Sequence, residues 1–216
     1  MLRKLFKSTA GPAAPAASFM PHYESNFAPL LAERAPGFRV IFERLEERAR
    51  ELDRPLLIIE TGSLRQPGNW AGDGQSTYQW GEFARMRDCQ VHTVDLDPEA
   101  ARLVQKHCGE QVQAHTGDSV AFLYAMAEAP DPPQIDLLYL DSFDFDPRDP
   151  FPSAMHHIKE LIAVRPCLGK GSIIAIDDNL VLPDGSHTGK GYLAMQWFDH
   201  LGIKCLYKGY QYIWQM

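Results

Sequence analysis

Hydrophobic and polar positions along the chain follow two periodicities, one typical of strands and one of helices. The run Leu56–Ile59 is apolar at every position, which predicts a strand buried on both faces of a parallel sheet. Before it, Phe38–Leu52 has apolar residues at helical spacing with Arg and Glu opposite, which predicts an amphipathic helix. Further helices are expected at residues 76–87, 98–108, 119–128, 151–165 and 189–201, and further strands at 90–95, 111–115, 135–140, 171–177, 203–208 and 210–215.

This order of elements predicts an α/β domain built on a mostly parallel, seven-stranded sheet. Alternating strands and helices imply right-handed crossovers, with helices on both faces of the sheet. The last two strands are separated only by Gly209, so they must form a hairpin. The C-terminal strand is therefore expected to run antiparallel to the others.

A glycine-rich loop follows the first strand. Glycines stand at Gly62, Gly68, Gly72 and Gly74 before a polar, helix-compatible segment begins. A strand, a glycine-rich turn and a helix together are typical of a nucleotide-binding unit. The spacing fits neither the dinucleotide fingerprint GxGxxG nor a phosphate-binding loop with its lysine. Glu60, at the strand end, would also repel phosphate, so a cationic or hydroxyl-bearing ligand is favoured.

Composition narrows the class of protein further. The formal net charge of -7 argues against non-specific nucleic-acid binding, which needs a basic face. The four cysteines form no CxxC motif, which favours reduced thiols and a cytoplasmic location. No apolar run reaches the ~18 residues of a membrane span, so we expect no membrane partner. We expect residues 1–20 to form a flexible arm and residues 21–216 to form a single domain; a homodimer is left open.

Acidic residues follow every strand of the expected parallel region. Ligands of open α/β sheets bind at the carboxyl ends of the strands, so these acids should line one edge. Asp95 lies at the distance from Gly74 at which an acid meets a ribose diol in nucleotide-binding units. The residues at the strand ends are Glu60, Asp95, Asp118, Asp141 and the run Asp177-Asp178-Asn179.

The fourth and fifth parallel strands bring together a set of oxygen ligands. Asp141, Asp178 and Asn179 offer two carboxylates and an amide oxygen, which suit Mg²⁺ or Ca²⁺ better than zinc. Asp177 is the alternative to Asp178, because one residue decides which side chain points inward. His187 lies in a loop near this set and is a candidate for contact with substrate.

The motifs IETG…AGDGQST, VDLDP, HTGDS, LYLDSFD and GSIIAIDDN, with the C-terminal hairpin, resemble the class I S-adenosylmethionine-dependent methyltransferases. The resemblance covers residues 38–216. It is strongest to the cation-dependent O-methyltransferases of the catechol, caffeoyl-CoA and antibiotic-sugar types. It implies a Rossmann-like three-layer αβα sandwich that transfers a methyl group to a small hydroxylated acceptor.

The resemblance also implies ligands and roles for particular residues. S-adenosylmethionine is the implied cofactor, with its ribose on Asp95 and its adenine edge on Asp118 and Ser119. A divalent cation, expected to be Mg²⁺, is implied at Asp141, Asp178 and Asn179. The full set of expected cofactor contacts is Glu60, Gly62, Ser63, Gly74, Ser76, Asp95, Leu96, Gly117, Asp118, Ser119 and Asp141.

Two departures from the family pattern affect these expectations. The loop between Gly62 and Gly72 is longer than the usual motif. The lysine base that catechol enzymes carry three residues beyond the first metal-binding Asp is replaced here by Asp144. We therefore expect Asp141 to act with the cation on the acceptor hydroxyl, and Asp144 or His187 to accept its proton.

Three other functions are compatible with parts of the sequence. One is a NAD-dependent oxidoreductase, against which the missing GxGxxG and the C-terminal hairpin speak. Another is a metal-independent methyltransferase in which Asp141 and Asp178 bind substrate directly. A third is a binding module without catalysis. Loops at residues 19–37, 142–152 and 180–190 would build the acceptor pocket, and they carry no decisive chemistry.

Overall fold

The helices and strands follow one another nearly as the hydrophobic pattern predicts. A computed structural model describes residues 17–216. The α-helices are α1 Met20–Asn26, α2 Ala35–Glu51, α3 Trp70–Asp73, α4 Ser76–Met86, α5 Pro98–His107, α6 Ser119–Ala127, α7 Phe151–Val164 and α8 Tyr192–His200, and the 3-10 helices are η2 Ala28–Leu30, η3 Ala32–Arg34 and η4 Arg165–Cys167. The strands are β1 Leu56–Thr61, β2 Cys89–Asp95, β3 Val112–Thr116, β4 Leu137–Leu140, β5 Ile173–Ile176, β6 Asn179–Val181, β7 His187–Gly189, β8 Cys205–Lys208 and β9 Tyr212–Gln215.

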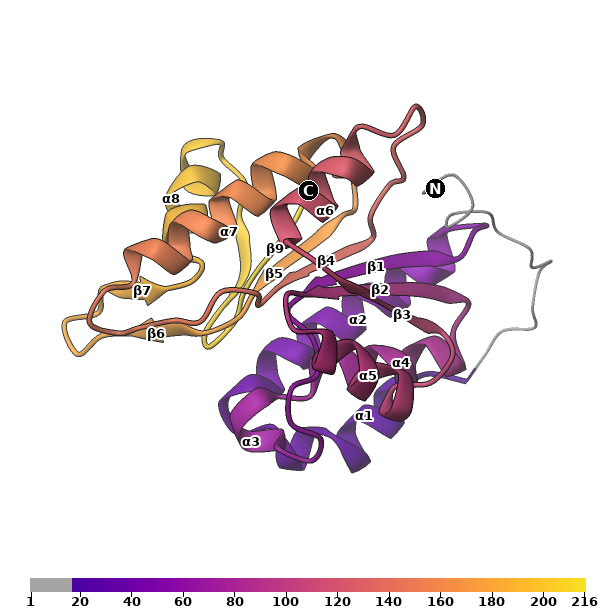
Figure 1. The fold of residues 1–216 in the computed structure, drawn as a ribbon. Helices are drawn as coiled ribbons and strands as arrows, with labels where there is room; N and C mark the ends of the chain where they lie inside the picture. The colour runs from indigo at the N-terminus through magenta and orange to yellow at the C-terminus, as the bar shows by residue number, and fades with distance from the viewer. Residues whose placement is uncertain (1–16) are drawn as a thin grey trace.

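The main sheet has seven strands in the order β3-β2-β1-β4-β5-β9-β8. Strand β1 pairs in parallel with β2 on one side and with β4 on the other, whereas β9 runs antiparallel to β5. The order reverses between β1 and β4, and ligands of open α/β sheets bind at such a switch point. The predicted Rossmann-like sheet with an antiparallel C-terminal strand is confirmed (Figure 1).

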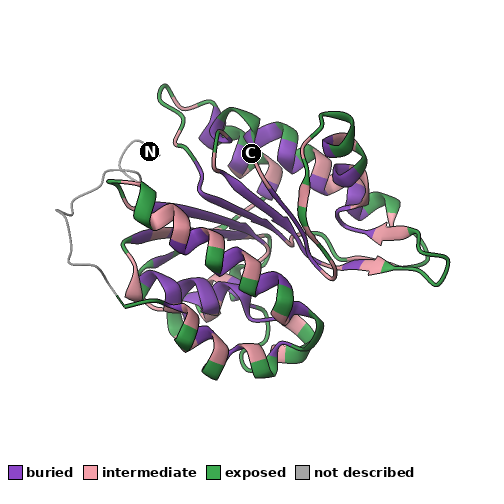
Figure 2. Cartoon of the chain, turned by 180° about the vertical axis from the view of Figure 1, so that it is seen from behind, coloured by how far each residue is buried: buried purple, intermediate pink, exposed green. Residues whose placement is uncertain are grey.

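Each face of the sheet carries its own hydrophobic core, because successive side chains of a strand point to opposite faces. Leu56 and Ile58 of β1 pack with α1, α2 and α4, whereas Leu57 and Ile59 pack with α6, α7 and α8. All six residues of β1 are buried, as the continuous apolar run predicts. Figure 2 shows the buried strands between helices whose outer faces are exposed.

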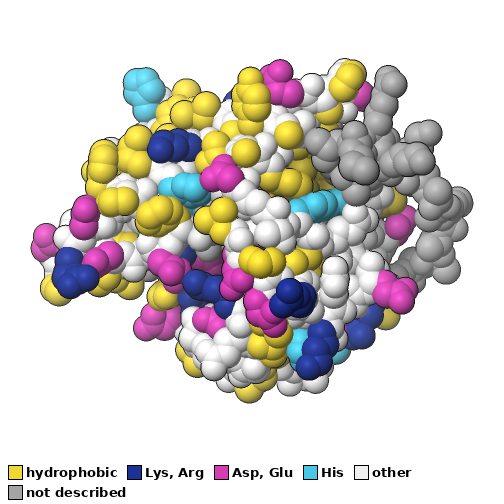
Figure 3. Space-filling model, in the orientation of Figure 1, with side chains coloured by type: hydrophobic (Ala, Val, Ile, Leu, Met, Phe, Trp, Pro, Cys, Tyr) yellow, Lys and Arg dark blue, Asp and Glu magenta, His cyan; other side chains and the backbone are white. Residues whose placement is uncertain are grey.

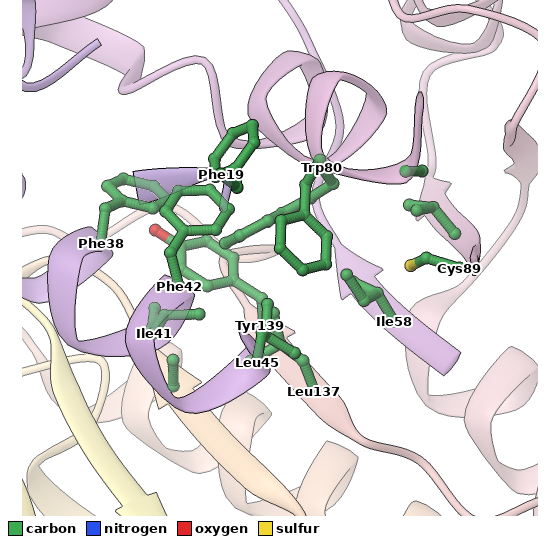
Figure 4. Packing of buried hydrophobic residues seen from close by; sticks show 14 of the residues in the cluster. Phe19, Phe38, Ile41, Phe42, Leu45, Ile58, Trp80, Cys89, Leu137 and Tyr139 are labelled. Atoms are coloured by element: carbon green, nitrogen blue, oxygen red, sulfur yellow. The ribbon is translucent and has the colours of Figure 1, made fainter. Parts of the chain in front are cut away.

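The larger core is rich in aromatic residues and includes the segment that begins at Phe19. Phe19 and Phe42 have ring centroids 4.6 Å apart, and Trp80 lies 5.4 Å from Tyr139 of β4 (Figure 4). Phe19 is fully buried and Met20 begins α1, so both belong to the folded domain. Of the flexible arm expected at residues 1–20, residues 1–16 lie outside the described part.

Several short elements, among them α1 and the 3-10 helices, were not expected from the sequence, and two of them lie in loops near the strand ends. The short helix α3 lies within the glycine-rich loop, and the two-stranded sheet β6–β7 occupies the segment between β5 and α8. As a result α8 begins at Tyr192 rather than at residue 189. Within residues 17–216, no helix combines the length and the apolar character needed to cross a bilayer.

Candidate active site

A hollow opens at the carboxyl ends of β2, β3 and β4, where the sheet topology predicts a ligand site. Five of the residues expected to bind the cofactor line it together with four that were not expected. The expected residues are Asp95, Leu96, Gly117, Asp118 and Ser119, and the others are Val94, Ser142, Phe143 and His156. The structure therefore gathers the residues that were predicted to bind ribose and adenine.

Asp95 is oriented by backbone donors on both of its carboxylate oxygens. Its Oδ2 accepts a hydrogen bond from the Ser63 backbone N–H at 2.9 Å, and its Oδ1 accepts one from Asp97 at 2.9 Å. Each oxygen keeps a second lone pair, and the side chain is only partly buried. A fixed carboxylate of this kind can receive both hydroxyl protons of a diol.

Apolar side chains stand exposed on the walls of this hollow. Leu96 is 73% exposed and Phe143 is 44% exposed, although both are large hydrophobic residues. The ring of His156 lies beside that of Phe143, with centroids 5.4 Å apart. Exposed apolar groups around a concave site are typical of a surface that packs on a ligand ring.

A chain of polar contacts beneath the hollow fixes His156. Its Nε2 lies 3.0 Å from Ser119 Oγ and 3.4 Å from the buried carboxylate of Glu160. Ser142 donates its hydroxyl to the same Glu160 oxygen at 2.7 Å. Burial alone would raise the pKa of Glu160, but contacts with His156, His157, Ser119 and Ser142 lower it to about 2. The carboxylate therefore stays charged and holds one wall of the hollow in place.

Glu60 does not line the hollow, contrary to the expectation of a cofactor contact. Its side chain is fully buried, and its carboxylate accepts hydrogen bonds from Thr77 Oγ1 at 2.6 Å and from Trp80 Nε1 at 2.9 Å. Ser76 is also mostly buried and contributes to this environment. Burial raises the pKa of Glu60 to about 7 despite these hydrogen bonds. The residue joins β1 to α4 inside the protein.

Protein neighbours account for two of the three glycines that were expected to touch the cofactor. Gly62 has φ of +82°, and a Cβ there would lie 2.5 Å from the backbone carbonyl oxygen of Asp141. Gly74 has φ of +66°, and its Cβ would lie 2.7 Å from Arg34 Cδ. Both positions therefore require glycine for close packing, whether or not a ligand approaches.

Three carboxylates, those of Asp141, Asp177 and Asp178, meet beside the hollow at the ends of β4 and β5. One oxygen from each lies within 4.8 Å of the other two. We call these three residues the acidic cluster. Ser142, which follows Asp141, lines the hollow, so the two features adjoin.

Asn179, the third residue expected to bind a cation, has backbone partners at both polar atoms of its side chain. Its side-chain oxygen accepts the Gly191 backbone N–H at 2.7 Å, and its amide nitrogen donates to the Ile176 carbonyl at 2.8 Å. Asn179 is 1% exposed and begins β6, where it pairs with Gly189 at the end of β7. Asp177, which was considered as the alternative to Asp178, belongs to the acidic cluster together with Asp178.

Two buried cations neutralise most of the acidic cluster. The Lys190 ammonium contacts Asp141 Oδ1, and it lies 2.9 Å from Asp178 Oδ2. Arg34 donates from Nε to Asp177 at 2.9 Å and from an Nη to Asp178 at 3.0 Å. Burial alone would lower the pKa of Lys190, but the two carboxylates outweigh it and the pKa is raised.

The cluster itself is held in an unusual geometry. Asp178 has φ of +52°, in the left-handed region that non-glycine residues rarely adopt. Tyr210 donates its hydroxyl to Asp178 at 2.7 Å, and the Arg34 guanidinium carbon lies 4.4 Å from the centre of the Tyr210 ring. In Figure 3, acidic and basic side chains lie together across the middle of the molecule, between the half with α7 and α8 and the half with α1 and α3.

The two expected proton acceptors lie apart from the cluster. Asp144 is exposed and forms an ion pair with Arg65 at 2.9 Å. His187, in β7, contacts the Tyr212 hydroxyl through Nδ1 at 2.7 Å. Of the three residues expected to be catalytic, only Asp141 belongs to the cluster.

Arg34, Lys190 and Tyr210 were missed by reasoning from the sequence. Arg34 lies far from the strand ends in the chain, at the end of η3, and no motif marks it. Lys190 stands between two glycines in a segment that was expected to begin a helix. The adjacent Asp177 and Asp178 were the one available signal, because neighbouring carboxylates that become buried need a basic partner.

Comparison with known proteins shows a likeness in fold. No protein-family model matches the chain, and no curated protein matches it. The solved structure of MycE methyltransferase from the mycinamycin biosynthetic pathway, in complex with Mg and SAH, matches with a TM-score of 0.51 and 15% identity. The match covers 91% of this chain but 49% of that one, so the chain spans about half the length of MycE.

A second match is closer in size. The apo structure of CalS11, described as a TDP-rhamnose 3′-O-methyltransferase of calicheamicin biosynthesis, matches with a TM-score of 0.51 and 20% identity. The match covers 94% of this chain and 88% of that one. With the strand order and the antiparallel β9, these likenesses establish that the chain has the class I methyltransferase fold.

Proposed function

We propose that the protein is an S-adenosylmethionine-dependent methyltransferase that transfers the methyl group to a hydroxyl of a small acceptor. The observation that carries this proposal is the hollow at the switch point of the sheet, lined by Asp95, Leu96, Asp118 and Ser119 beside the acidic cluster. The same fold occurs in the methyltransferases MycE and CalS11.

The hollow fits the adenosine part of such a cofactor. Asp95, fixed by two backbone N–H groups, would accept the ribose hydroxyls. Leu96 and Phe143 would pack on the adenine ring, and Ser119, which lines the hollow, would offer its hydroxyl at the edge of that ring. Apolar packing with a few fixed polar groups is the usual design of a cofactor site.

The acidic cluster suits the reacting end of the cofactor. When bound, S-adenosylmethionine supplies a methyl group on a positively charged sulfur. With all three carboxylates ionised, the cluster and its two cations have a formal net charge of -1, which attracts a cation. Placing the cofactor and the acceptor side by side accounts for several kcal/mol of catalysis by orientation alone.

We assign the proton acceptor to Asp141 rather than to Asp144 or His187. Lys190 occupies its Oδ1, which leaves Oδ2 to receive the acceptor hydroxyl. The bound cofactor would supply the methyl group with its sulfur as leaving group, and Asp141 Oδ2 would take the proton that the acceptor hydroxyl loses. Burial raises the pKa of Asp141, which makes it a better base than an exposed aspartate.

Assistance by a divalent cation remains a prediction, and the observed contacts do not fit it. The carboxylate oxygens are chemically suitable for Mg²⁺. The Lys190 ammonium, however, already lies between Asp141 and Asp178, and the Asn179 oxygen is bound to Gly191. We therefore assign no step of the reaction to a metal.

The proposal is tested by methyl transfer from radiolabelled S-adenosylmethionine to a panel of sugars, catechols and other hydroxylated molecules. The wild-type protein should label at least one acceptor, and Asp141→Asn should abolish labelling. Asp144→Asn is the matched control, because Asp144 is exposed and lies outside the cluster. Equal loss in both variants, or none in Asp141→Asn, would contradict the role of Asp141.

A further inference from the structure

Lys190 lies where the ligands of a hard cation converge, yet it is a residue of the chain itself. Its ammonium contacts Asp141 Oδ1 and Asp178 Oδ2, and its Nζ also lies 3.4 Å from the Asp141 carbonyl oxygen. These three oxygens account for all three donors of the ammonium. The side chain is 0% exposed, so it has no donor left for solvent or substrate.

The backbone around Lys190 fixes it in this position. Its own N–H donates to the Asp178 carbonyl at 3.2 Å, and the next N–H, of Gly191, donates to Asn179. Gly189 pairs with Asn179 across the β6–β7 sheet and has φ of +122°, where a Cβ would lie 2.3 Å from the Asp178 carbonyl oxygen. The short sheet thus returns the chain to the end of β5 and delivers the lysine to the cluster.

Charge balance favours the lysine over a metal at this place. The acidic cluster with Arg34 and Lys190 carries one net negative charge. A divalent cation added to the same groups would make the net charge positive, next to a site proposed for a sulfonium cation. Expelling the ammonium instead would leave it buried and unpaired, which costs several kcal/mol.

We propose that the ammonium of Lys190 takes the place of a divalent cation, so that the protein transfers methyl groups without a metal. The inference rests on the proposed function. Lys190 acts as a positioning residue: it keeps the Asp141 and Asp178 carboxylates side by side and leaves Asp141 Oδ2 directed to the acceptor. The Asn179 side chain, which the family resemblance assigned to a metal, accepts the N–H of Gly191, the residue after the lysine.

Metal binding provides a readout that is independent of activity. We would titrate the full chain with Mn²⁺ and follow binding by electron paramagnetic resonance and calorimetry. The wild-type protein should bind no Mn²⁺ at the cluster, and its methyl transfer should be the same with and without EDTA. Lys190→Met should create a Mn²⁺ site, tightening binding by about tenfold or more, because two carboxylates lose their cation.

Controls separate this gain from other effects. Lys204→Met removes an exposed lysine and should bind no Mn²⁺. Adding Asp141→Asn to Lys190→Met should remove the new site. Wild-type Mn²⁺ binding that disappears in Asp178→Asn would overturn the proposal, even if Lys190→Met does not fold. S-adenosylhomocysteine binding is measured in parallel: its absence would refute the proposed function, whereas its presence with wild-type metal binding would refute only this inference.

Discussion

Replacing Glu60 by Gln should make the protein more stable at alkaline pH and change its stability much less at acidic pH. Glu60 is a fully buried carboxyl group between β1 and α4, with Thr77 and Trp80 as hydrogen-bond partners. Glutamine has nearly the same shape and can keep both contacts, but it cannot ionise. The substitution therefore isolates the cost of burying a charge.

The size of the effect follows from the pKa of Glu60. Burial raises it from the usual 4.5 to about 7, so between these pH values the folded state holds a proton that the unfolded state releases. Stability therefore falls as pH rises through this window, and the loss is complete above pH 7. One pKa unit corresponds to about 1.4 kcal/mol. The free energy of unfolding of Glu60→Gln, relative to that of wild type, should therefore rise by about 2–3 kcal/mol between pH 5 and pH 8.5.

Urea denaturation of wild type and variant at both pH values measures this difference. Glu46→Gln is the control of opposite sign: burial alone would raise the pKa of Glu46, but hydrogen bonds from Phe19 and Ser18 and the charge of Arg87 lower it. Glu46 contributes stability above its usual pKa, so its replacement should be costly at pH 8.5. A Glu60→Gln effect that is equal at pH 5 and pH 8.5 would refute the buried-charge argument. Because Glu60 lies outside the hollow, the variant should bind S-adenosylhomocysteine like wild type.

Three other predictions concern residues around the site. Asp95→Asn should weaken S-adenosylhomocysteine binding about 10- to 100-fold in calorimetry without lowering the melting temperature; unchanged affinity would remove Asp95 from the ribose site. Arg34→Met should cost about 3–5 kcal/mol in urea denaturation, because Asp177 loses its buried partner, and a cost below 1 kcal/mol would contradict the pairing. Gly62→Ala should lower the free energy of unfolding by at least about 2 kcal/mol more than Gly68→Ala does. Both glycines have positive φ, but only at Gly62 does a backbone carbonyl lie 2.5 Å from the new Cβ; equal losses would contradict the close approach.

The sheet could be predicted from the sequence because its central strands β1, β4 and β5 are buried on both faces. The apolar run of β1 indicated a parallel sheet, and the short connection at Gly209 between β8 and β9 indicated its antiparallel end. Elements of three or four residues have too few side chains to show the hydrophobic periodicity of a helix or a strand. For this reason α3, β6 and β7 were not predicted. Phe19 was missed for another reason: its partners, such as Phe42 and Phe83, are distant in sequence.

The site was predicted in part, for reasons that differ between residues. Asp95 and Asp118 follow strands directly, so the topology alone brings them to one edge. Glu60 also ends a strand, but side chains alternate between faces, and its side chain points into the core against Trp80. Lys190 and Arg34 reach the cluster through tertiary packing, which a pattern of local periodicity cannot show.

The most direct test of the account is calorimetry of the wild-type protein with S-adenosylhomocysteine and, separately, with NAD. The account predicts that S-adenosylhomocysteine binds at one site per chain and that NAD does not compete for it. No binding of S-adenosylhomocysteine, or binding of NAD in its place, would contradict the assignment of the hollow at Asp95 and Asp118 to a methyl-donating nucleoside.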